Sequence, residues 1–316
     1  MRRRLPAYGV FAVLLLLAPY ALENLTLFTL SSGVLMTLLA IGSLGMVPLT
    51  GAARQVSLGQ AAFYGIGGYA SAILTTRYDV NPWLGILAGA VLSAAVAWVL
   101  GSVIFRIQGH YLSLATLAFG LALAALANEV PFTGRNAGIS GIPALSLFGF
   151  AFDDDRSTYY LFAGILLVAI AVVHLVLGSA FGRSLTAAGD SPIAAAASGI
   201  NIKGLRRTAF VISAVTASVA GSGYAHWYRF VDPSMLGILA SVQLLIIVTV
   251  GGRESVWGAP LGAFAVVTLA QAAQQLPSAG ASNELTAYGI VLILSLLLLP
   301  RGLAGVPAMV ARVVRR

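Results

Sequence analysis

The chain of 316 residues contains no cysteine and only three histidines, and charged residues make up only 9% of it. Soluble domains carry about 25% charged residues. The absence of cysteine excludes disulfide bonds, thiolate metal sites and cysteine nucleophiles. Apolar residues, in contrast, make up 59% of the chain. This composition predicts an integral membrane protein.

Long stretches without charge alternate with short polar segments. Residues 83–105, WLGILAGAVLSAAVAWVLGSVIF, contain no charged side chain, and about 20 apolar residues span the roughly 30 Å hydrocarbon core. Backbone amides in the membrane must bond internally, so such stretches form helices. We therefore predict an all-α membrane protein, a single transmembrane domain over 1–316 and a polytopic bundle of about ten helices. The expected spans are 7–23, 27–49, 56–76, 83–105, 110–128, 158–180, 207–228, 234–251, 258–276 and 285–300.

Basic residues fall mostly on one side of these spans, which predicts that both termini are cytoplasmic. With that orientation, 14 of the 18 basic residues face the cytoplasm, as the positive-inside rule requires. The net charge of +8 is then explained by orientation, without a nucleic-acid partner. The basic, apolar start of the chain also fits a signal peptide, but no small-residue cleavage site is evident and we expect a first span. The longest loops are a periplasmic one at about 129–157 and a cytoplasmic one at about 181–206.

Ionisable residues are almost absent from the expected spans, where they usually mark ion or proton routes. Only His174 lies well inside one, while His226 is expected at an outer end, in an aromatic belt. The chain shows no Ser/His/Asp arrangement, no metal-ligand cluster and no phosphate-binding loop. A secondary transporter would be expected to carry membrane carboxylates, and a membrane enzyme a polar catalytic cluster. If the protein moves a solute uphill, the energy is expected to come from another subunit.

One short polar segment, GDSPIAAAASGIN (189–201), has the signals of a helix start and a helix end. Ser191 is suited to the N-cap and Pro192 to the first helical position. Gly199 is suited to the left-handed position that ends a helix. So short a helix is marginal alone in water and needs a surface. Its alanine face permits close approach by a partner protein, and a helix resting on the bilayer is the alternative.

Six strings along the chain resemble, in order, branched-chain amino acid ABC transporter permeases of the LivM type. They are VSLGQAAFYGIGGYASAIL (56–74), GHYLSLATLAFG (109–120), TGRNAGISGIP (133–143), FGRSLTAAGDSPIAAAASGINIKGLRRTAFVISAVTASVAGSGYAHWYRFVDP (181–233), VGGRESVWGAPLGA (250–263) and PRGLAG (300–305). The resemblance implies the ABC importer permease fold and a non-catalytic subunit of an importer in the bacterial inner membrane. The transported solute would be a branched-chain amino acid, or urea, a short amide or an aromatic acid.

The resemblance also implies partners. These are a LivH-type permease, two ABC ATPase subunits that bind ATP and Mg, and a periplasmic solute-binding protein; this chain itself would bind no cofactor. The short segment would be the coupling helix to an ATPase, with Ala195 and Ala196 expected to face that subunit. Its residues are Asp190, Ser191, Pro192, Ile193, Ala194, Ala195, Ala196, Ala197, Ser198 and Gly199.

Polar residues within the spans are candidates for the translocation path: Gln60, Tyr64, Thr116 and Gln243. The amide of Gln243 lies near mid-span and is expected either to contact solute or to join two helices. The glycines of GIGGY (65–69) either interrupt the third span, as at transport sites, or permit close helix packing. The spacing of Ala214, Ser218 and Ser222 also indicates a packing stripe.

Overall fold

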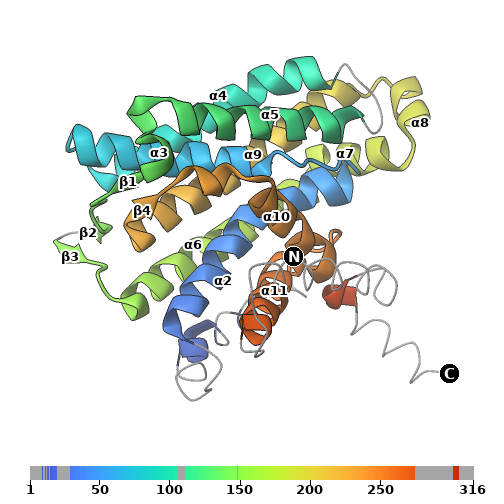
Figure 1. Ribbon diagram of the computed structural model, residues 1–316. Helices are drawn as coiled ribbons and strands as arrows, with labels where there is room; N and C mark the ends of the chain where they lie inside the picture. The colour runs from blue at the N-terminus through green and yellow to red at the C-terminus, as the bar shows by residue number, and fades with distance from the viewer. Residues whose placement is uncertain are drawn as a thin grey trace.

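The computed structural model describes residues 9, 11, 13, 15–19, 29–105, 111–147, 149–274 and 302–305, and these are mostly helical (Figure 1). The predicted helical class is confirmed. The helices are α2 (Leu30–Leu44), α3 (Gln60–Arg77), α4 (Pro82–Ile104), α5 (Tyr111–Glu129), α6 (Asp155–Gly178), α7 (Ala180–Asp190), α8 (Pro192–Ala197), α9 (Ile202–Tyr228), α10 (Ile238–Gly251) and α11 (Gly258–Gln274). A π-helix, η1 (Val47–Ala52), follows α2, and 3-10 turns lie at η2 (Pro131–Thr133), η3 (Arg135–Ala137), η4 (Pro233–Leu236) and η5 (Leu303–Gly305).

Four of the described helices are long and apolar enough to cross a membrane: α4, α5, α6 and α9. Shorter apolar helices occupy Leu30–Leu44, Ile238–Gly251 and Gly258–Ala272. The expected span 285–300 lies outside the described residues, and span 7–23 is described only at scattered helical positions. The total of ten spans therefore stays a prediction.

Helix α9 lies at the centre of the bundle. Of its most apolar stretch, 61% is buried, against 28% for α4 and α6 and 22% for α5. The outer helices carry large exposed side chains such as Leu87 and Val168, which suits contact with lipid. The central position of α9 explains why its sequence is rich in small residues.

Helices α3, α4 and α9 pack through their glycines. A Cβ atom at Gly67 would overlap the carbonyl oxygen of Ser218, and one at Gly221 would overlap that of Tyr64. At Gly89 of α4, a Cβ would lie 3.2 Å from the Cα of Gly67. Helix α3 runs without a break through its glycines, so the packing interpretation of GIGGY is confirmed.

The two ends of the bundle differ. Two pairs of two-residue strands lie at one end, which we call the strand end: β1 (Ile139–Ser140) with β4 (Phe230–Val231), and β2 (Ser146–Leu147) with β3 (Phe150–Ala151), both antiparallel. Helices α7 and α8 lie at the opposite end, which we call the α8 end (Figure 1). These four short strands are a local exception to the predicted all-α fold.

Candidate functional site

Helix α8 is capped by its own chain at both ends. The Ser191 hydroxyl accepts from the Ala194 amide at 3.4 Å, and Pro192 takes the first helical position. At the other end, the Gly199 amide donates to Ala196 and the Ile200 amide to Ala195, at 3.0 and 3.1 Å. With φ of +77° at Gly199, this is a Schellman ending. The predicted start and end of the short helix are confirmed.

The faces of α8 differ from the expectation. Ala195 is only 4% exposed, on a helix that contacts α7 and α9, so the prediction that Ala195 faces a partner is wrong. Ala196 is exposed, as expected. The side chain that stands out is Ile193, which is 86% exposed and the most exposed large apolar residue in the described part of the chain. At 3.6 residues per turn, six residues make fewer than two turns, so α8 has few inward positions, and Ala195 is the one that is buried.

Asp190 belongs to α7 rather than to the short helix. It is the last residue of α7, and its carboxylate forms an ion pair with the Arg54 guanidinium at 2.5 Å. Both side chains remain more than half exposed, at 60% for Arg54 and 55% for Asp190. Arg54 lies two residues after the end of η1 and has a left-handed φ of 52°. The ion pair therefore joins the residue before the α8 cap to the segment that follows η1.

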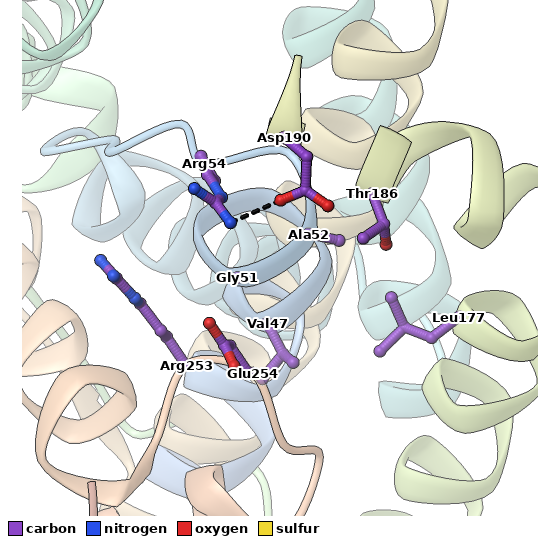
Figure 2. A pocket seen from close by; sticks show the side chains of 9 residues that line it. All are labelled: Val47, Gly51, Ala52, Arg54, Leu177, Thr186, Asp190, Arg253 and Glu254. Atoms are coloured by element: carbon purple, nitrogen blue, oxygen red, sulfur yellow. Dashed lines mark hydrogen bonds and ion pairs between the residues drawn. The ribbon is translucent and has the colours of Figure 1, made fainter. Parts of the chain in front are cut away.

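A cavity of about 330 Å³ opens beside this ion pair (Figure 2). It brings together η1, the end of α7, the end of α6 and the loop between α10 and α11. Figure 2 shows Arg54 and Asp190 at its upper rim and Arg253 and Glu254 below them. Sequence reasoning missed this convergence, since the four charges lie in three separate polar segments with no common motif. The lining residues are Val47, Gly51, Ala52, Arg54, Leu177, Thr186, Asp190, Arg253 and Glu254.

Two of the four path candidates, Gln60 and Thr116, lie in one region at the start of α3. The Thr116 hydroxyl accepts from the Leu58 amide and donates to the Ser113 carbonyl, both at 3.0 Å. Thr116 is 1% exposed and Gln60 is fully buried, and within the described residues neither amide atom of Gln60 has a hydrogen-bond partner. An unpaired buried polar group costs about 1–3 kcal/mol. Thr116 therefore has a structural role, because its hydroxyl bonds two backbone groups. Gln60 is the candidate whose side-chain amide has no hydrogen-bond partner among the described residues.

The other two path candidates, Tyr64 and Gln243, lie on α3 and α10. Tyr64 is 6% exposed and packs on Tyr224 of α9, with ring centroids 6.0 Å apart. Gln243 is half-buried on α10. None of the four residues lines the cavity of Figure 2, so their part in a translocation path stays a prediction.

At the strand end, polar side chains join separate segments through hydrogen bonds and an ion pair. Asp155 accepts hydrogen bonds from Ser31 and from the indole of Trp227, the latter at 2.9 Å. Asp153 pairs with Arg229 at 2.5 Å. His226 lies near the end of α9, as expected, but it is 2% exposed, so its predicted place in an interfacial aromatic belt is wrong. Its Nδ1 lies 2.8 Å from the Pro143 carbonyl oxygen and its Nε2 2.7 Å from the Ser71 hydroxyl.

The sequence matches the family model for the branched-chain amino acid transport system permease component over residues 28–299. The chain therefore belongs to this permease family. It is 30% identical over 248 residues to the high-affinity branched-chain amino acid transport permease LivM of Escherichia coli, covering 71% of this chain and 58% of that relative. This chain thus spans less than two thirds of the LivM length.

Two further relatives show that the proteins similar to this chain are named for more than one solute. A probable branched-chain amino acid transport permease, LivH of Methanocaldococcus jannaschii, is 26% identical over 86% of this chain and 89% of its own length. The fructose import permease FrcC of Rhizobium meliloti is 24% identical over 61% of this chain and 56% of its own. Similarity alone therefore defines a permease family without defining one solute.

Proposed function

We propose that this protein is the transmembrane permease subunit of an ATP-driven importer for branched-chain or related amino acids in the bacterial inner membrane. It binds no cofactor and hydrolyses no ATP itself; two ABC ATPase subunits bind ATP and Mg. A LivH-type permease completes the membrane part, and a periplasmic solute-binding protein delivers the solute. The α8 end faces the cytoplasm and the strand end faces the periplasm. The family match and the six ordered strings support this proposal.

The observation that carries the proposal is the exposed surface of α8. Among its six residues only Ala195 is buried, and Ile193 projects almost fully into solvent. An isoleucine side chain gains about 1.5–3 kcal/mol when it is buried. A partner that covers α8 would gain this burial free energy without a cost for ordering the helix, because the caps at both ends already fix its conformation. The helix is therefore suited to a groove on an ATPase subunit.

The bilayer surface is the alternative site for α8. Helices that lie in the membrane interface carry a polar face rich in lysine and arginine. Helix α8, PIAAAA, contains neither. Its small alanine side chains instead permit a protein groove to approach the backbone closely. A protein partner is therefore the better supported occupant.

In this mechanism, ATP-driven closure of the ATPase subunits displaces α8, and the displacement alters the packing of the membrane helices. Helix α8 contacts α7 and α9, and α9 is the central helix of the bundle. A movement at α8 therefore has a direct mechanical route to the bundle core. The chain contributes shape and contacts, while the free energy comes from ATP on the partner subunits.

The test is solute uptake by proteoliposomes that hold the complete importer, with ATP inside and the solute-binding protein outside. Labelled leucine, isoleucine and valine are compared with urea, a short amide, an aromatic acid and fructose. We expect accumulation of the branched-chain amino acids that requires both ATP and the binding protein. Leucine uptake without ATP would instead indicate a secondary transporter, and uptake of another solute alone would overturn the amino-acid assignment.

A further inference from the structure

We propose that the Arg54–Asp190 ion pair is the link that transmits movement of α8 to η1 and α2, and so couples ATP hydrolysis to transport. This inference rests on the proposed function, in which α8 contacts an ATPase subunit. Arg54 and Asp190 are positioning residues here, because neither needs to touch the solute or the nucleotide. The geometry of three chain segments points to this role.

Asp190 is positioned to move together with α8. It immediately precedes Ser191, the N-cap of α8, so a displacement of α8 moves Asp190 as well. The carboxylate does not cap α8, since the Ser191 hydroxyl does that. It points instead to Arg54, as the dashed line in Figure 2 shows. A displacement of Asp190 would therefore act on Arg54 through the ion pair, and so on η1.

Arg54 is connected to the membrane helices through η1 and α2. Arg54 lies two residues after η1, and η1 follows α2 with only Gly45 and Met46 between them, both in right-handed helical conformation. The segment from Leu30 to Ala52 is thus nearly continuous helix. Force applied at Arg54 therefore reaches a helix that packs on α6, α9 and α11.

The π-helix η1 is in close backbone contact with two other segments. A Cβ atom at Gly189, next to Asp190, would overlap the carbonyl oxygen of Ala52. On the other side, a Cβ at Gly51 would overlap the carbonyl oxygen of Arg253 in the loop between α10 and α11. The π-helix is thus held between backbone atoms of two segments. π-helical turns inside helical segments occur frequently at functional sites.

The ion pair is unsuited to a purely stabilising role. Both side chains are more than half exposed, and exposed pairs contribute little to stability. Arg229–Asp153 at the strand end offers a matched control. It has the same 2.5 Å separation and similar side-chain exposures of 51% and 63%. Its arginine has nearly the same left-handed φ, 57° against 52°.

The experiment compares Arg54→Ala, Asp190→Ala, the charge exchange Arg54→Asp with Asp190→Arg, and the control Arg229→Ala, all in the complete importer. Three quantities are measured: co-purification of the ATPase subunits, ATP hydrolysis, and labelled leucine transported per ATP hydrolysed. We expect both single variants at the α8 end to retain the ATPase subunits. Solute transported per ATP should fall about fivefold or more, the lower end of typical coupling between sites. The charge exchange should restore most of this loss, and Arg229→Ala should change none of the three quantities.

Each other outcome overturns the inference. An unchanged ratio of solute to ATP in Arg54→Ala would show that the pair transmits nothing. An equal fall in Arg229→Ala would show a general effect of losing an exposed arginine. A charge exchange without rescue would exclude the ion pair, and loss of the ATPase subunits would make Arg54 part of the docking contact instead. Failure of the proposed function looks different, because the unmodified chain would then bind no ATPase subunit.

Discussion

The exposed side chain of Ile193 provides a quantitative test of ATPase docking. Ile193→Ala removes three carbon groups, each worth about 0.8 kcal/mol when buried. If the partner covers the side chain completely, the loss is about 2.4 kcal/mol, or roughly 50-fold in affinity at 1.4 kcal/mol per decade. The fold itself should be unaffected, because a side chain that is 86% exposed makes few contacts within the chain.

The assay is a titration of the purified ATPase subunit onto the permease pair in lipid nanodiscs, with the dissociation constant as readout. Val168→Ala is the matched control, since Val168 is also apolar and 65% exposed but lies on the membrane helix α6. It should bind the ATPase like the unmodified chain. If Ile193→Ala and Ile193→Asp both keep the unmodified affinity, Ile193 is not a docking contact, and the reasoning from its exposure fails.

Three further predictions test the short helix, the buried amide and the orientation. Gly199→Val should weaken ATPase binding while Gly199→Asn retains it, because the φ of +77° disfavours a β-branched residue but is tolerated by asparagine. Equal binding of both variants would show that the C-terminal cap of α8 does not contribute to docking. Gln60→Leu should match or exceed the unmodified thermal stability, since it removes a buried amide that has no hydrogen-bond partner among the described residues, and it should change uptake; a lower melting temperature would reveal a structural role for the amide. A cysteine at Ser140 should react with an impermeant maleimide from outside and one at Ser198 only after permeabilisation, and the reverse would invert the topology.

The ends of α8 could be predicted from the sequence because caps are local. Ser191, Pro192 and Gly199 act on atoms within a few residues, so three residue types suffice to place both ends. Which face of the helix turns inward could not be predicted. PIAAAA contains four alanines and no amphipathic pattern, so the burial of Ala195 and the exposure of Ile193 depend on the position of α7 and α9.

The α8 end as a whole depends on long-range contacts. The π-helix η1 follows an apolar run that predicts ordinary helix. It packs tightly on a distant segment, since a Cβ at Gly51 would overlap the carbonyl oxygen of Arg253. The Arg54–Asp190 pair joins residues 136 positions apart. No local pattern marks such a partner, and the same holds for His226, whose hydrogen-bond partners Ser71 and Pro143 lie in other segments.

The most direct test of the central claim is the identity of the molecule that contacts α8 in the assembled importer. The chain has no native cysteine, so a single cysteine at Ile193 can carry a short photo-activated crosslinker in native membranes, with a cysteine at Leu147 of the strand end as control. We predict that position 193 forms a covalent product with an ATPase subunit and position 147 does not. Crosslinking of position 193 to lipid alone, in membranes where the ATPase subunits co-purify with the chain, would contradict the account.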